Sequence, residues 1–190
     1  LDYELLVSDN CSTDETPEIL ARHAARHPRM KVVRQNSNIG AHANIMWTFY
    51  QARGQVVVSI SDDDMMVPHQ LLNYVRRMDE DRDLVMLQSP WYLLDETRDN
   101  AIIGKFYDLP EERRFGYGDY APCLEFLLNG HIFPECWLLR TDAVSRVIGT
   151  RHPYAYNYFN MLTRALSLGD VLFTPEPHIT ETAIAKGQNA

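Results

Sequence analysis

One stretch, from Gln55 to Pro68, constrains the fold of this chain more than any other. It reads QVVVSISDDDMMVP, and its nearly continuous β-branched run is typical of a strand that helices cover on both faces. Three adjacent carboxylates follow at Asp62, Asp63 and Asp64. We therefore expect these acids at the carboxyl end of a buried strand, where open α/β sheets bind ligands.

Three neighbouring like charges repel one another unless a cation or solvent offsets them. Oxygen ligands of this kind suit Mg²⁺ or Mn²⁺, and such an ion is commonly shared with phosphate oxygens. The stretch therefore favours a metal and diphosphate site. A second interpretation stays open, in which the acids form a solvated turn that caps the next helix, because acids are favourable near a helix N-terminus.

Composition limits the class of protein. A chain of 190 residues with 45% hydrophobic residues is long enough for one domain with a sizeable core. Its formal net charge of −8 argues against nucleic acid as a partner. The three cysteines are odd in number and lack metal spacing, which favours packing roles in a reduced compartment such as the cytoplasm. No apolar run approaches the roughly 18 residues of a membrane-spanning segment.

Strands and helices alternate through the first half of the chain. We expect strands at 3–7, 31–34 and 56–60, and helices up to 27, at 41–53 and from Pro68 onward. The first helix has two possible starts, a capping-box spacing from Ser12 and a Thr-Pro pair at Thr16, and the pattern does not choose between them. This alternation predicts an α/β fold with a mostly parallel sheet flanked by helices.

The second half is less regular. We expect one long strand at 84–94, a polar turn at 95–100, and then an irregular segment to about Gly118 whose aromatic residues favour a functional lid. Beyond it we expect helices at 121–129, 142–148 and 157–167, and strands at 135–140 and 171–174.

Three motifs then occur in order: SDNCSTDET from Ser8, NSNIG from Asn36 with Asn44 after it, and SDDD ahead of Pro68. Together they resemble the inverting family-2 glycosyltransferases of the GT-A fold, and they are most similar to bacterial enzymes that add deoxysugars to surface polysaccharides. The resemblance implies a Rossmann-like sheet in a single domain, 1–190. Residues 1–94 would bind the nucleotide sugar, and 95–190 would form the acceptor side.

The resemblance also implies site residues. Asp9 would hydrogen-bond the nucleotide base, with Ser12 shaping its turn. Asp62 is expected near the ribose, and Asp63 on the Mn²⁺ or Mg²⁺ ion that holds the diphosphate. The sequence departs from the commonest DxD form, because Ser61 stands where the first Asp often lies.

Four further positions carry weaker expectations. Asp64 could compensate for Ser61 as a metal ligand, and His178 could close on the metal, although a surface position suits His178 better. Asn38 and Asn44 could support the nucleotide. They are equally well explained as a turn former and a polar residue on a helix surface.

The expected chemistry needs a base that takes the proton of the acceptor hydroxyl. The stretch where the family carries this acid, Asn157–Asn160 before Arg164, holds no carboxylate. Glu135 in HIFPECW is the candidate by motif neighbourhood, with Asp119 and Asp170 as weaker ones. An acid at a strand edge is the competing interpretation of Glu135.

The expected partners are a nucleotide-diphosphate sugar and a saccharide or lipid-linked acceptor, in the cytoplasm or, through partners, at the inner face of the membrane. A non-catalytic nucleotide-sugar-binding or scaffold domain is the alternative, because the base is missing from its usual place. A nucleotidyltransferase would need a Gly-rich loop after the first strand, which this sequence lacks. The resemblance also implies one more strand upstream of Leu1. We therefore expect an N-terminally truncated, poorly stable chain without transferase activity.

Overall fold

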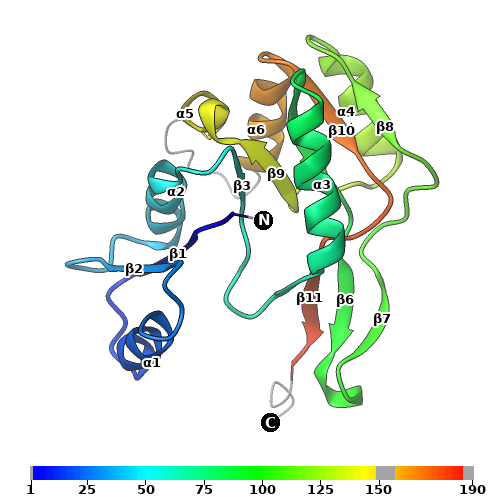
Figure 1. The fold of residues 1–190 in the computed structure, drawn as a ribbon. Coiled ribbons are helices and arrows are strands. Elements are labelled where there is room, and N and C mark those ends of the chain that lie inside the picture. The colour runs from blue at the N-terminus through cyan, green and yellow to red at the C-terminus, as the bar shows by residue number, and fades with distance from the viewer. Residues whose placement is uncertain (1, 149–156, 186–190) are drawn as a thin grey trace.

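The computed structural model describes residues 2–148 and 157–185 and shows three sheets with helices packed around them (Figure 1). The first sheet is a parallel pair, β1 (Leu5–Asp9) and β2 (Met30–Arg34), connected by α1 (Thr16–Ala24). α2 (Ala41–Gln51) packs against β1. We call these four elements the N-terminal unit, drawn in blue to cyan in Figure 1.

The start of α1 settles the choice between the two predicted helix starts. The helix begins at Thr16, whose backbone N–H bonds Oδ1 of Asp14 at 3.0 Å, and Pro17 occupies its first turn. The Thr-Pro start is therefore confirmed, and the start at Ser12 is wrong. Ser12 is instead held in the preceding turn, where its backbone N–H donates to Asp9.

The central sheet has five strands. In spatial order they are β3 (Val56–Val58), β9 (Trp137–Arg140), β5 (Leu84–Gln88), β10 (Asp170–Phe173) and β8 (Arg113–Phe115). β5 and β10 pair in parallel, whereas β9 and β8 run antiparallel to their neighbours. The α/β class is confirmed, but the sheet is mixed rather than mostly parallel because β9 lies between β3 and β5.

Helices cover both faces of the central sheet, as the apolar strands predict. α3 (Pro68–Glu80) covers one face, where Leu138 of β9 lies in a cluster with Tyr74 and Met78. The other face packs against the elements α4 (Tyr120–Asn129), α5 (Val144–Val147) and α6 (Asn157–Leu166). Leu139, the next residue of β9, points to that second cluster. The sheet is thus buried on both sides, which explains its continuous apolar sequence.

The third sheet has the order β4 (Met65–Met66), β11 (Ile179–Ile184), β6 (Tyr92–Asp95) and β7 (Ala101–Lys105). Short 3₁₀ turns at Glu96–Arg98 and Thr141–Ala143 complete the elements. Figure 1 shows β11, β6 and β7 side by side, below the central sheet in that view. Neither β11 nor β7 was expected from the sequence.

Two expectations about this region are wrong. Residues 84–94 do not form one strand, because the chain leaves the central sheet after Gln88 and enters the third sheet at Tyr92. The segment interpreted as a lid is built into the fold instead: β7 pairs with β6, β8 pairs with β10, and Tyr107 and Leu109 between them are buried.

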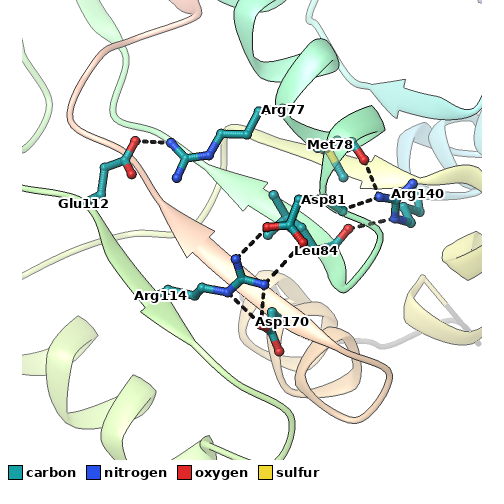
Figure 2. Close-up of polar contacts among 8 residues, drawn as sticks. All are labelled: Arg77, Met78, Asp81, Leu84, Glu112, Arg114, Arg140 and Asp170. Atoms are coloured by element: carbon teal, nitrogen blue, oxygen red, sulfur yellow. Dashed lines mark hydrogen bonds and ion pairs between the residues drawn. The ribbon is translucent and has the colours of Figure 1, made fainter.

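Arginines fasten the end of α3 to the central sheet (Figure 2). The buried Arg140 of β9 donates to the backbone carbonyls of Met78, Asp81 and Leu84, at 2.6 Å for Asp81 and 2.8 Å for Leu84. The bond to Met78 satisfies a carbonyl that the helix end leaves without a partner, and the bonds to Asp81 and Leu84 hold the turn between α3 and β5. Nearby, Arg114 of β8 joins Asp81 at 2.5 Å and Asp170 at 2.6 Å, which ties three elements together.

Within residues 2–148 and 157–185, no helix has the length and apolar character that a membrane crossing needs.

Candidate functional site

The carboxyl end of β1 gathers the four predicted residues of the first two motifs. Asp9 ends the strand and is buried, and its Oδ1 accepts the backbone N–H of Ser12 at 2.8 Å. Its Oδ2 lies 3.5 Å from Nε of Arg34 and has no hydrogen-bond partner in the described part of the chain. Hydrogen bonding from Ser12, followed by the charge of Arg34, holds the pKa of Asp9 below its ordinary value. Asp9 is therefore a charged acceptor at a strand end.

The two asparagines shape this strand end. Asn44 of α2 donates to the carbonyl of Ser8 at 2.9 Å and accepts from the Ser8 hydroxyl at 2.5 Å. Asn38 accepts from Asn10 at 3.0 Å and from the backbone N–H of Gly40 at 2.9 Å. Asn38 is thus a turn former, as one of its two interpretations had it, and Asn44 links α2 to Ser8 of β1. Support of the nucleotide by either residue stays a prediction. Asn10, which the sequence did not single out, links the two loops.

The acids of SDDD lie in the loop between β3 and β4. Asp62 and Asp63 are exposed, and within the described residues their side chains make no hydrogen bond or ion pair. Asp64 is half-buried, and burial, followed by repulsion from Asp63, raises its pKa. The interpretation as a helix cap is wrong, because α3 begins at Pro68 after Val67 and no side chain of the described residues bonds its N-terminus.

The surroundings of these acids decide whether they fit a divalent ion. Two exposed carboxylates with no protein partner are available as hard oxygen ligands, which suits Mg²⁺ or Mn²⁺. In the described part of the chain, no three His, Cys, Asp or Glu side chains are grouped to hold a metal. Asp62 and Asp63 therefore fit an ion that takes its remaining ligands from phosphate and water.

His178 does not fit this role. Its side chain is fully buried, with Nδ1 2.6 Å from Oγ of Ser89 and its ring edge-to-face with Tyr74 at 5.8 Å. Burial lowers its pKa to about 4, so the imidazole is neutral. The expectation of a surface position is wrong, and an ion held at the exposed Asp62 and Asp63 would not reach the enclosed ring.

A second acid, Glu181, lies near Glu135 and was not predicted from the sequence. The hydroxyl of Tyr158 donates to Oε1 of Glu135 at 3.2 Å, and Sγ of Cys136 lies 3.3 Å from Oε1 of Glu181 on β11. Burial raises the pKa of Glu135. Burial, with repulsion from Asp64, Glu135 and Asp63, raises the pKa of Glu181 to about 7. The alternating sequence ITETAI was the one signal that could have predicted this strand.

These two glutamates line a cavity of about 510 Å³, within the range of small-molecule sites. The other walls are mainly apolar and come from Trp91, Leu93, Phe106 and Phe133. The weaker base candidates lie elsewhere: Asp119 bonds the backbone of Gly116, and Asp170 bonds Arg114. A separate cavity of about 400 Å³, beside Arg53 and Arg140, contains none of the predicted site residues.

The fold is the GT-A fold, an α/β architecture with its acids at the ends of strands and in the loop after β3. It matches S. aureus TarS in complex with UDP, with a TM-score of 0.68 and 18% identity over 95% of this chain and 51% of TarS. It also matches the mannosyltransferase PcManGT of Pyrobaculum calidifontis in complex with GDP-Man and Mn²⁺, with a TM-score of 0.64 and 17% identity over 97% of this chain and 49% of that protein.

The model of glycosyl transferase family 2 matches residues 1–148, and the chain belongs to this family. A relative from Edwardsiella ictaluri, an undecaprenyl-phosphate 4-deoxy-4-formamido-L-arabinose transferase, is 34% identical over 85 residues. That match covers 44% of this chain and 26% of the relative. The chain thus matches about a quarter of this relative's length and about half of each solved structure.

Proposed function

We propose that this chain forms part of an enzyme that transfers a sugar from a nucleoside-diphosphate sugar to an acceptor hydroxyl, with a divalent metal ion and inversion at the anomeric carbon. The observation that carries the proposal is the state of Asp9. It is a buried, charged carboxylate at the end of β1, and its Oδ2 lacks a hydrogen-bond partner in the described part of the chain. Such a group suits an N–H of a nucleotide base.

The acids after β3 would serve the diphosphate. Asp62 lies beside Asp63 in the same exposed loop, and we assign Asp62 to the ribose and Asp63 to a Mn²⁺ or Mg²⁺ ion. When bound, the ion offsets the charge that develops on the departing diphosphate. The structures of TarS with UDP and PcManGT with GDP-Man and Mn²⁺ support these assignments by likeness of fold.

Glu135 is the proposed base. In the transfer, the acceptor oxygen forms a bond to the anomeric carbon, the bond from that carbon to the diphosphate breaks, and the hydroxyl proton passes to Glu135. Tyr158 donates to one carboxylate oxygen of Glu135, which orients the group and leaves the second oxygen for the acceptor. Burial raises the pKa of Glu135, which improves it as a proton acceptor for this step.

Calorimetry tests the donor site. We expect UDP or GDP to bind with Mn²⁺ and to lose affinity when a chelator is added, and Asp63→Ala should show the same loss without chelator. Asp9→Asn should weaken binding by about 1.5–3 kcal/mol, because one charge-assisted hydrogen bond is lost. Asp79→Asn is the matched control, since Asp79 is an exposed acid paired with Arg82 outside the site. Unchanged affinity in both the chelator and the Asp9→Asn experiments contradicts the proposal.

Turnover separates the enzyme from a non-catalytic binding domain. In the whole enzyme of which this chain forms part, donor hydrolysis across UDP, dTDP, CDP and GDP sugars should identify one donor, and Glu135→Gln should abolish its turnover while nucleotide still binds. Full turnover by Glu135→Gln removes Glu135 from the mechanism without affecting the donor site.

A further inference from the structure

The cavity beside Glu135 has a wall made of two stacked aromatic rings. Trp91, before β6, and Phe106, after β7, lie with ring centroids 4.3 Å apart and planes 13° apart. The backbone N–H of Phe106 donates to the carbonyl of Trp91 at 3.0 Å, which fixes the pair. Trp91 is only 2% exposed whereas Phe106 is 49% exposed, so Trp91 supports Phe106 from behind.

A third aromatic ring and the two glutamates come from other segments. Phe133 packs edge-to-face on Tyr158 at 5.5 Å, and Tyr158 in turn bonds Glu135. Glu181 reaches the cavity from β11, which pairs with β6 through Glu181 and Leu93. The cavity therefore combines apolar ring surfaces with two hydrogen-bonding carboxylates. A pyranose ring has the complementary character, with an apolar face of C–H bonds and a rim of hydroxyl donors.

In the described part of the chain, the charged side chains that line the cavity are all acidic. They are Glu135 and Glu181, and none of the described lining residues is Lys, Arg or His. Asp63 and Asp64 carry the same sign of charge and lie close enough to repel the carboxylate of Glu181. The cation next in sequence to Phe106, Lys105, is turned to the carbonyl of Pro175 at 3.1 Å and to Glu176. A bound carboxylate or phosphate would be repelled here, and an ammonium group would be attracted.

We infer that this cavity binds the acceptor, and that the acceptor presents a pyranose ring that is neutral or bears an amino group, not an anionic sugar. Phe106 stacks on the ring, and Glu135 and Glu181 accept hydrogen bonds from its hydroxyl or ammonium groups. The assignment of the bound sugar as the acceptor rests on the proposed transferase function. The preference for a pyranose ring and its charge selectivity rest on the cavity itself.

The test compares three probes that share one ring: methyl β-D-glucosaminide, methyl β-D-glucoside and methyl β-D-glucuronide. Ligand-observed NMR titrations of the protein without nucleotide should rank the glucosaminide first and the glucuronide last, with at least a tenfold gap between these two. The gap should narrow at high salt, because screening weakens the field of the four acids. A glucuronide that binds as tightly as the glucosaminide overturns the inference, and this comparison needs no variant.

Substitutions of cavity residues test whether the three probes bind in this cavity. Phe106→Ala should weaken all three probes at least fivefold, while Phe106→Tyr, which keeps the ring, should not. Tyr117→Ala is the control, because Tyr117 is an exposed aromatic outside the cavity. Glu181→Gln should reduce the gap between glucosaminide and glucuronide. Binding that is indifferent to both Phe106→Ala and Glu181→Gln places the sugar elsewhere and overturns the assignment.

Nucleotide titrations of the same samples separate this inference from the proposed function. Pyranoside binding without any binding of UDP or GDP, with or without Mn²⁺, refutes the transferase proposal and leaves the sugar site standing. Nucleotide binding without any pyranoside binding refutes the sugar site and leaves the donor proposal standing.

Discussion

The residues of the N-terminal unit are much less buried than those of the central sheet. In α1 no residue is buried, in β1 only Asp9 is, and in α2 only Phe49 is. Every residue of β5 and β9 is buried. The thinly packed unit carries the predicted contact to the nucleotide base, as expected when binding segments come from the less stable end of a fold, and the well-packed sheet carries the core. The predicted site residues Asp62, Asp63 and Glu135 lie instead in loops next to strands of that sheet.

The two regions meet through few side chains. Phe49 of α2 lies 5.2 Å from Trp137 of β9, ring to ring, and joins the main core cluster. Among the described residues, β1 pairs only with β2, and β3 pairs only with β9, so no strand ladder connects the regions. The expectation of a further strand upstream of Leu1 stays a prediction.

The largest expected effect tests the difference in burial between the two regions. Leu139 of β9 is 0% exposed, and Leu139→Ala should lower the free energy of unfolding by about 2–5 kcal/mol, because it removes packed methyl groups and leaves a cavity. Leu5 of β1 is 42% exposed, and Leu5→Ala should cost about 1 kcal/mol or less. Urea unfolding at one pH measures both. Equal losses would break the comparison between the two regions.

How much of this arrangement could be predicted depends on how local its causes are. Asp9, Ser12, Asn38 and Asn44 belong to short motifs that specify a strand end and its turns, so their place at the end of β1 follows from local sequence, and their contacts to a nucleotide stay predictions. Glu181 depends on pairing of β11 with β4 and β6, which are distant in sequence. No local pattern placed it beside Glu135.

Two further errors have similar causes. The break between β5 and β6 was missed because Ser89, Pro90 and Trp91 are buried like the strands beside them. His178 was expected on the surface, yet its ring is enclosed by Tyr74 and Ser89. Tertiary contacts, not local preference, decided both.

A second prediction compares a buried arginine of the central sheet with a half-exposed arginine nearby. Arg140→Met should lower the free energy of unfolding by about 1.5–3 kcal/mol, because it leaves the carbonyls of Met78, Asp81 and Leu84 without their charged donor. Arg77→Met is the matched control in the same corner of the molecule (Figure 2), where Arg77 makes a half-exposed pair with Glu112.

The control should cost about 0–1 kcal/mol, as is usual for such pairs. Thermal unfolding of both variants at equal protein concentration gives the difference. A loss for Arg77→Met as large as that for Arg140→Met would mean that burial of the arginine is not what fastens α3 to the sheet.

The smallest expected effect is on the pH dependence of stability. The contributions of Asp9 in the N-terminal unit and of Glu181 in the cavity should change with pH in opposite directions. In the N-terminal unit, hydrogen bonds hold the pKa of Asp9 below its unfolded value, so its stabilising contribution is present at neutral pH and is lost as the pH falls. In the cavity, the pKa of Glu181 is raised from 4.5 to about 7. Its contribution is most favourable below pH 4.5 and is lost as the pH rises through 7.

Glu181→Gln should therefore gain stability relative to the parent between pH 5 and pH 8, by less than about 1 kcal/mol because the carboxyl is half exposed and solvent screens it. Asp9→Asn should be destabilising at pH 7, and its deficit should shrink as the pH approaches the pKa of Asp9. Urea unfolding of the parent and the two variants at several pH values measures both slopes. If the Glu181→Gln difference is flat with pH, or falls as the pH rises, burial and the neighbouring acids raise the pKa of Glu181 less than the structure implies.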